Sequence, residues 1–349
     1  MKTLAILCVR NEAAFLLEWL AHTRAVGFTD FLVFSNDCQD GTDQMLDRLD
    51  DLGIVKHIRN DGPYDKGGIQ FTALKQADKL PMVKKADWIL PLDVDEFVNI
   101  KVGNHRLEDL HAALPEADAI TMTWRLFGNA GVVRFDGSSI LDQFTRCAPE
   151  ILHWPWRASM FKTYYRNFGA YKKVGVHRPR SPDDKKAAKT RWFDGEGREL
   201  DEKFRTKRIF SNFGRSNTAL VQLNHYPLGA IESYVMKADR GRAVHSDHML
   251  GVDYWVERNF NQEEDTSIQA LAAPRKKQFD SFMADPELAD LHAKAIAWRK
   301  SHFEKLMLKE PFRALFGRLL MTAPTRLVPK NAARFMVGFA NTARKKNGN

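Results

Sequence analysis

Cysteine is scarce in this sequence, and long hydrophobic runs are missing from it. The three cysteines, Cys8, Cys38 and Cys147, are too few and too far apart for a disulfide framework or a zinc site. No apolar stretch approaches the length of a membrane-spanning helix. The first apolar run, residues 4–9, is too short for a signal peptide, and we expect it to be a strand. These features predict a protein of a reducing compartment that does not cross a bilayer.

The positive charge of the chain is concentrated near its C-terminus. The 349 residues are 44% hydrophobic and 28% charged, which is typical of a globular protein with one large domain or two. The formal net charge is +9, but ten basic residues against two acids give residues 301–349 a charge of +8, which leaves about +1 for residues 1–300. This distribution argues against a nucleic-acid-binding protein and favours contact between the tail and an anionic membrane surface.

Strands and helices are expected to alternate along the first hundred residues. The hydrophobic pattern predicts strands at residues 3–9, 31–34, 54–58 and 88–92, and helices at residues 11–26, 42–52 and 69–80. Asn11 is the expected N-cap of the first helix and Gly27 its C-cap. Such alternation is typical of a parallel α/β sheet flanked by helices.

Beyond residue 100 the pattern is less regular. A helix at residues 107–114 and strands at 119–124 and 219–223 are expected, followed by helices at 231–242, 252–260 and 285–308. Residues 149–213 are rich in Trp, Tyr, Lys and Arg, and we expect loops and short strands there. Trp124 and Phe127 either line a sugar pocket or belong to the core.

Three polar loops follow the first, second and fourth of these strands, at residues 10–12, 35–42 and 93–96. In a parallel α/β sheet, ligands bind at the carboxyl ends of the strands. The first two loops also open helices, whose free N–H groups favour phosphate. Each loop alone is explained as a capped turn, but their joint placement predicts a nucleotide site.

Asp93 and Asp95 stand at the end of the fourth expected strand. In an extended segment they would project to one face, roughly 6 to 7 Å apart along the backbone, while Glu96 points elsewhere. Two such carboxylates can share a hard cation and leave its other positions for phosphate oxygens. His225, which follows the strand at residues 219–223, can complete the ligand set. The alternatives are acids that cap a turn and a buried histidine bonded to the backbone.

The tail carries two apolar helical stripes. The first is formed by residues at helical spacing, namely Phe312, Leu315, Phe316, Leu319 and Leu320, and residues 333–343 repeat the pattern more weakly before three basic residues. Burial against the domain and binding at a membrane interface both explain such stripes.

Taken together, these motifs make the chain resemble the glycosyltransferase family 2-like proteins of GT-A fold, in particular a bacterial branch similar to glycosyltransferase family 92. The likeness rests on residues 9–12 with Glu18, Trp19 and Gly27, on residues 35–42 and 93–97, and on residues 224–226 with Lys237, Arg240 and Gly241. It implies a GT-A-like, Rossmann-like, mostly parallel sheet flanked by helices. The implied division is a glycosyltransferase domain at 1–250, with a nucleotide-sugar half at 1–125 and an acceptor half at 126–250, and a helical, basic C-terminal region at 251–349.

The resemblance also implies roles for individual residues. Asp93 and Asp95 would hold Mn²⁺ or Mg²⁺ on the diphosphate of a nucleotide sugar, and Lys237 and Arg240 would stabilise the leaving diphosphate. Arg10, Asn11 and Glu12 would line the nucleotide pocket, and Asn36 and Asp37 would meet the base and ribose. Asn36 stands where many family 2 members carry aspartate, and the usual carboxylate pair and Gln-x-x-Arg-Trp motif are missing. The catalytic base is therefore not implied by the resemblance, and processive polymer synthesis is disfavoured.

The expected activity is a metal-dependent, inverting transfer of sugar from a nucleotide sugar, a UDP-sugar in the first instance, to a hydroxyl of a glycan or lipid-linked acceptor. Candidates for the base that deprotonates this hydroxyl are Asp194, Glu196 and Glu150, each of which is also explained as a loop or surface acid. The resemblance implies a bacterial role in surface polysaccharide or lipopolysaccharide synthesis, in the cytoplasm at the inner face of the membrane.

Two other functions compete with this one. A sugar-nucleotide pyrophosphorylase uses a similar sheet and a metal, but the sequence has no glycine-rich phosphate loop with arginine and lysine after the first strand. In a non-catalytic membrane-surface protein, the acids would merely cap a helix and the tail would carry the function.

Overall fold

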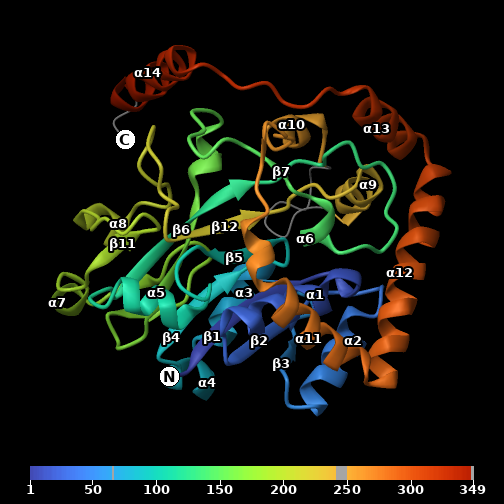
Figure 1. The fold of residues 1–349 in the computed structure, drawn as a ribbon, viewed down its shortest axis with the longest axis horizontal. Coiled ribbons are helices and arrows are strands. Elements are labelled where there is room, and N and C mark those ends of the chain that lie inside the picture. The colour runs from blue at the N-terminus through green and yellow to red at the C-terminus, as the bar shows by residue number, and fades with distance from the viewer. Residues whose placement is uncertain (65–66, 241–249, 347–349) are drawn as a thin grey trace.

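A nine-stranded mixed sheet forms the centre of the molecule (Figure 1). The computed structural model describes residues 1–64, 67–240 and 250–346. The strands lie in the order β3-β2-β1-β4-β8-β6-β12-β5, and β11 pairs with β6. Their bounds are β1 Thr3–Val9, β2 Asp30–Ser35, β3 Lys56–Arg59, β4 Trp88–Leu92, β5 Glu96–Ile100, β6 Ala119–Leu126, β8 Phe161–Arg166, β11 Trp192–Asp194 and β12 Val221–His225. Five of the eight strand pairings are parallel, so the expected α/β, mostly parallel architecture is confirmed.

Helices cover both faces of the sheet. They are α1 Ala13–Val26, α2 Thr42–Asp51, α3 Gly68–Ala77, α4 Pro81–Lys85, α5 Leu107–Ala113, α6 Ile140–Gln143, α7 Asp184–Ala187, α8 Glu202–Thr206, α9 Ile231–Arg240, α10 Val252–Val256, α11 Ala272–Met283, α12 Pro286–Met307, α13 Glu310–Met321 and α14 Lys330–Lys346. Two small ribbons, β7 Arg146–Cys147 with β13 Glu263–Glu264 and β9 Tyr171–Lys173 with β10 Arg180–Pro182, complete the described structure.

The side chains of β1 show how the sheet divides the core. Ala5, Leu7 and Val9 face the cluster that contains α1, whereas Leu4 and Ile6 face the cluster that contains α3. All five side chains are buried, as expected for a central parallel strand that is covered on both faces. The continuous apolar run at the start of the chain is therefore the physical reason that β1 takes the middle of the N-terminal half.

Two strands of the sheet were not expected from the sequence. β8 runs antiparallel between β4 and β6, inside the segment that was expected to contain only loops and short strands. β5 forms an antiparallel edge beside β12. β8 carries Lys162 and Thr163, which are both buried, so the strand lacks the apolar signal of a core strand. The polar residues of β8 are tolerated because each has a partner: Lys162 pairs with Asp93, and Thr163 donates to the backbone oxygen of His177 at 2.9 Å.

Several helix boundaries differ from the expectation. The N-cap of α1 is Glu12 and not Asn11, whose side-chain oxygen instead accepts a hydrogen bond from the backbone N–H of Gln39 at 2.7 Å. Gly27 is the left-handed C-cap that was expected, with φ at 115°. The helix predicted at residues 69–80 is α3, which ends at Ala77, and α4 and α11 were not predicted. The expected end of α9 at residue 242 lies outside the described residues.

The C-terminal helices pack against the sheet domain in different ways. α11 and α12 both pack against α1, and α12 also contacts α2 and α9. α13 packs on α9, and its Leu315 and Leu319 are almost fully buried, so burial explains the first apolar stripe of the tail. α14 lies apart from these helices along the edge of the molecule (Figure 1). Within the described residues, no helix combines the length and the apolarity that a membrane span requires.

Candidate functional site

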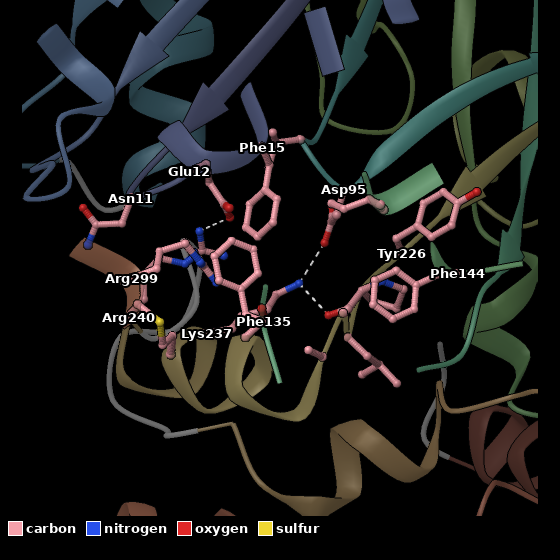
Figure 2. Close-up of a pocket in the computed structure, with 18 of the residues that line it drawn as sticks. Asn11, Glu12, Phe15, Asp95, Phe135, Phe144, Tyr226, Lys237, Arg240 and Arg299 are labelled. Carbon is pink, nitrogen blue, oxygen red and sulfur yellow. Dashed lines mark hydrogen bonds and ion pairs between the residues drawn. The ribbon is translucent and has the colours of Figure 1, made fainter. Parts of the chain in front are cut away.

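A pocket of about 790 Å³ lies where the start of α1, the turn before β5, α9 and α12 meet (Figure 2). Its walls include Glu12, Asp95, Lys237, Arg240 and Arg299, with Phe15 and Phe135 supplying apolar surface. A pocket in which a few charged groups converge beside apolar side chains is typical of a small-molecule site. The pocket lies at the carboxyl ends of β1 and β4, where ligands of parallel sheets bind.

One side of the pocket is built around Glu12. The guanidinium of Arg240 forms an ion pair with the Glu12 carboxylate and donates to the backbone oxygen of Arg10 at 2.7 Å. Burial would lower the pKa of Arg240, but the Glu12 carboxylate raises it above its usual value. Arg299 of α12 stacks on Phe15, with its guanidinium carbon 4.5 Å from the ring centre, and burial lowers its pKa to about 10.

The other side is built around Asp95. The ammonium of Lys237 lies 2.8 Å from Asp95 Oδ2 and also donates to the backbone oxygen of Pro227 at 2.9 Å. His225 Nε2 lies 3.7 Å from the same carboxylate oxygen. Burial would raise the pKa of Asp95, but the lysine and the histidine hold it well below its usual range. Burial lowers the pKa of His225 despite the nearby carboxylate, so its ring is neutral at pH 7.

Asp93 takes part in a separate network. Its carboxylate pairs with the ammonium of Lys162 at 2.9 Å and accepts a hydrogen bond from Gln70 at 2.9 Å. The fully buried Glu96 accepts from the indole of Trp124 at 2.7 Å and lies 3.4 Å from the same ammonium. Burial raises the pKa of Glu96 to about 8. Sequence reasoning missed Lys162, because its partners come from another strand.

The expectation that Asp93 and Asp95 share one face of a strand is wrong. β4 ends at Leu92, and a turn follows in which the N–H of Glu96 donates to the backbone oxygen of Asp93 at 3.0 Å. In this turn the strand alternation no longer applies, and each aspartate pairs with a different lysine.

The residues that fit a divalent cation best are Asp95 and His225. Among the described residues, no group of three Asp, Glu, His or Cys side chains converges on one point. Asp95 lines the pocket, and the neutral His225, which is buried behind it, nevertheless places a nitrogen donor beside the carboxylate oxygen. Mg²⁺ in particular is commonly held by one or two protein ligands with phosphate oxygens and water in its other positions. Asp93 does not join this pair, since its carboxylate faces Lys162.

The loop expected to meet the base and ribose lies outside the pocket walls. Asn36 is buried and fixes the loops around it, since its amide donates to the backbone oxygen of Val9 at 2.9 Å and accepts from Asn60 at 2.6 Å. Asp37, with a left-handed φ of 45°, accepts a hydrogen bond from the hydroxyl of Tyr64. Asn36 thus has an internal structural role, and contact of Asp37 with a base or ribose stays a prediction.

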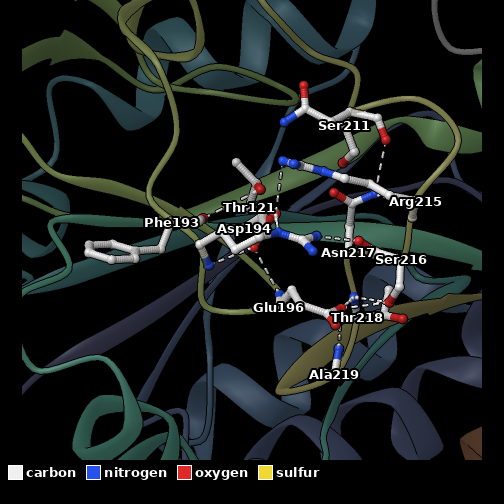
Figure 3. A network of polar contacts seen from close by, with 12 residues as sticks. Thr121, Phe193, Asp194, Glu196, Ser211, Arg215, Ser216, Asn217, Thr218 and Ala219 are labelled. Atoms are coloured by element: carbon white, nitrogen blue, oxygen red, sulfur yellow. Dashed lines mark hydrogen bonds and ion pairs between the residues drawn. The ribbon is translucent and has the colours of Figure 1, made fainter.

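The structure brings Asp194, Glu196 and Glu150 together, but away from the pocket (Figure 3). Glu196 and Glu150 both accept from the hydroxyl of Ser216, at 2.6 and 2.5 Å. Asp194 is almost fully buried and accepts from Arg198 at 3.0 Å. These contacts join the loops that precede β12, whereas His225 lies at the far end of that five-residue strand, roughly 13 Å from its first residue. None of the three acids lines the pocket.

A histidine–aspartate pair that was not predicted does line it. His302 Nε2 of α12 lies 2.9 Å from Asp239 Oδ2 of α9. The imidazole stacks on Trp298 at a centroid distance of 4.6 Å and an angle of 6°. All three side chains face the pocket. Because 63 positions separate His302 from Asp239, only the packing of α12 on α9 reveals the pair.

Comparison with known proteins gives the family of the chain. The model of glycosyltransferase family 92 matches residues 5–185, more than half of the chain. The chain belongs to glycosyltransferase family 92. The match includes β1, α1 and the Asp93–Asp95 turn of this family 92 protein, and it ends before β12 and α9. Membership of a transferase family favours the expected activity over the pyrophosphorylase alternative.

Individual similarities of this family 92 protein are weaker. A glycosyltransferase family 92 protein of Oryza sativa subsp. japonica is 22% identical over 149 residues, which are 41% of this chain and 24% of the rice protein. The chain thus spans about a quarter of that relative's length.

Two solved structures are similar to the chain at low identity. The structure of S. aureus TarS 1-349 with UDP-GlcNAc is 15% identical, with a TM-score of 0.34, over 90% of this chain and 84% of that one. The structure of the same protein with UDP is 14% identical, with a TM-score of 0.34, over 86% and 89% of the two chains.

Proposed function

We propose that this family 92 protein transfers a sugar from a nucleotide sugar, a UDP-sugar in the first instance, to a hydroxyl group of an acceptor. The observation that carries this proposal is the pair of half-buried cations Lys237 and Arg240, which lie nearly one turn apart on α9 and line a pocket at the carboxyl edge of the sheet. The leaving nucleoside diphosphate gains negative charge in the transition state. Cations fixed before the reaction stabilise this charge without reorganising.

We further propose that Asp95 and His225 hold Mn²⁺ or Mg²⁺ in the working enzyme. When bound, the ion would act as a Lewis acid on the diphosphate oxygens. Lys237 pairs with the same carboxylate oxygen and holds the Asp95 carboxylate at the pocket wall. Asp93, held by Lys162, would orient the turn that carries Asp95.

For the acceptor proton we propose His302 as the base. A neutral imidazole accepts a proton at a single nitrogen, and a carboxylate beside it stabilises the imidazolium that forms. Asp239 supplies that carboxylate. With the base facing the pocket, attack on the anomeric carbon from the face opposite the diphosphate gives inversion. The acids Asp194, Glu196 and Glu150 then serve to hold the loops before β12.

The acceptor we propose is a glycan or a lipid-linked sugar at the inner face of the cytoplasmic membrane. Phe135, Phe144 and Trp298 line the pocket and offer flat apolar faces on which sugar rings can pack. A sugar ring has an apolar face of its own, so such contacts bury it without leaving its hydroxyls unpaired.

Calorimetric titration of UDP and GDP into the native protein tests the donor site, with Mn²⁺ and with a chelator. We expect one nucleotide to bind, more tightly with metal, and Asp95→Ala and Lys237→Ala to weaken binding at least ~tenfold. Asp280→Ala, which removes an exposed carboxylate paired only with Lys276, is the matched control and should bind as the native protein does. If neither nucleotide binds under any metal condition, the proposed function is wrong.

A further inference from the structure

The last helix, α14, exposes large apolar side chains to solvent. Phe335 is 69% exposed, Phe339 64% and Met336 40%, and the two phenylalanine rings touch at a centroid distance of 5.0 Å. Of residues 330–343, whose side chains the structure describes, Ala333 alone is buried. α14 thus differs from α13, whose Leu315 and Leu319 are buried in the cluster that contains α9.

Charge is distributed unevenly around α14 and along residues 311–349. Residues 311–349 contain eight lysines and arginines and no acid. At roughly 100° per residue, Phe335, Met336 and Phe339 fall within an arc of about 100° on the helix. Lys330 and Arg334 fall on the opposite side. A helix with an apolar arc, a basic face and no acids complements a surface that is negatively charged outside and apolar beneath.

We propose that α14 lies in the surface of an anionic phospholipid bilayer. The two phenylalanines and Met336 insert between the acyl chains, and the basic residues lie among the lipid head groups. Among the possible occupants of this face, charge complementarity selects the anionic lipid, because a second copy of the helix would bring five more positive charges against the first five. The binding itself does not depend on the proposed transfer reaction.

Such an anchor would hold the candidate site near the membrane. Residues 322–329 join α14 to α13, and α13 packs on α9, which carries Lys237 and Arg240. If the proposed function holds, the acceptor is then an amphiphile whose head group is presented at that surface.

Co-sedimentation of the full chain with vesicles tests the proposal, with phosphatidylcholine alone and with phosphatidylcholine mixed with phosphatidylglycerol. We expect binding to the anionic vesicles only, a decrease with added salt, and a loss of at least ~tenfold in partitioning for Phe335→Ser/Phe339→Ser. The matched control is Leu308→Ser, which removes an apolar side chain that is 81% exposed at the end of α12 and should bind like the native chain.

Two further measurements keep the proposal falsifiable. Tryptophan placed by Phe339→Trp should show a blue-shifted emission with anionic vesicles. Light scattering without lipid reports whether the helix pairs with a second copy. The proposal would be overturned if the native chain bound both vesicle types equally, or if the double variant bound anionic vesicles as the native chain does. It would also be overturned if the native chain formed a dimer that the double variant does not form.

Discussion

Lys162 is the residue whose environment most constrains the candidate site. Its ammonium is 1% exposed and lies between the carboxylates of Asp93 and Glu96, at 2.9 and 3.4 Å. Burial raises the pKa of Glu96 to about 8, and the charge of Asp93 adds to this effect while Lys162 opposes it. The turn that carries Asp95 is therefore held by one ion pair and one carboxyl group that is mostly protonated at pH 7.

Replacing Lys162 with methionine should destabilise the protein strongly. The substitution leaves the carboxylate of Asp93 without its buried cation, which typically costs about 3–5 kcal/mol of unfolding free energy. Urea unfolding measures the change. Lys276→Met, at an exposed pair with Asp280, should change stability by less than ~1 kcal/mol, and an equal loss in both variants would contradict our account of Lys162.

Glu96 should make stability fall as pH rises. Its pKa is raised from 4.5 to about 8 in the folded protein, so between these values the unfolded chain releases a proton that the native protein keeps. The contribution of Glu96 is fully present below pH 4.5 and is lost as pH approaches 8, at up to about 1.4 kcal/mol per pH unit.

Urea unfolding of the native protein and of Glu96→Gln, measured from pH 5 to pH 8, checks this pH dependence of stability. The variant should lose this part of the pH dependence. Its stability at pH 5 should also be lower, because both oxygens of Glu96 accept N–H groups and an amide nitrogen cannot do so. Parallel pH profiles of the two proteins would show that Glu96 does not titrate in this range.

His302 provides the test of the proposed base. Once a donor and an acceptor are found, His302→Gln should lower the turnover with acceptor by roughly 10²- to 10⁴-fold and leave UDP binding unchanged. Asp239→Asn should have a smaller effect in the same direction, because it removes the carboxylate that supports the imidazolium. If added imidazole restored the turnover of His302→Ala, this would separate a proton-transfer role of His302 from a structural one. Native turnover in His302→Gln would exclude His302 as the base.

Among the elements, α6 shows how a short helix depends on a distant side chain. Its four residues cannot be stable alone, and its N-terminus is held by Glu18 of α1. The Glu18 carboxylate accepts from the hydroxyl of Ser139 at 2.5 Å and from the N–H groups of Ile140 and Leu141 at 2.9 and 3.2 Å. Glu18 thereby fixes the segment that brings Ile140 and Phe144 to the pocket.

Glu18→Ala should loosen this wall of the pocket. Three donors lose their acceptor, so we expect a loss of about 1–3 kcal/mol in unfolding free energy and faster amide exchange at residues 138–144. Hydrogen–deuterium exchange with mass spectrometry measures the second effect, and amides of β1 provide the internal reference. Unchanged exchange at residues 138–144 would mean that packing alone holds α6.

At the scale of the whole molecule, α12 determines which groups meet in the pocket. It crosses α1, α2 and α9, and it contributes Trp298, Arg299 and His302 to the pocket walls. The family match ends at residue 185, so this wall lies outside the matched part of the chain. The boundary expected at residue 250 stays a prediction, but the pocket is built from both sides of it.

Truncation after residue 329 should separate the proposed nucleotide binding from the proposed membrane binding. Because α14 buries little of its surface, the shortened protein should keep its unfolding free energy to within about 0.5 kcal/mol and bind nucleotide as before. Binding to anionic vesicles should be lost. Loss of nucleotide binding in a folded truncated protein would contradict the independence of α14 from the pocket.

The sequence by itself determined the N-terminal half of the sheet and the position of its ligand edge. The apolar runs of β1, β2 and β4 and the polar loops after them are local patterns, so the order of elements from β1 to β4 and the place of Glu12 and Asp95 in the site followed from periodicity. Only the tertiary structure decided which charges meet. Lys162, Glu96 and His302 acquire their roles from partners on other elements, and Asp93 and Asp95 diverge because a turn replaces the expected strand. Local sequence patterns determine which face of a strand or helix a side chain lies on. The partners of a side chain in ion pairs and hydrogen bonds depend instead on how distant segments pack.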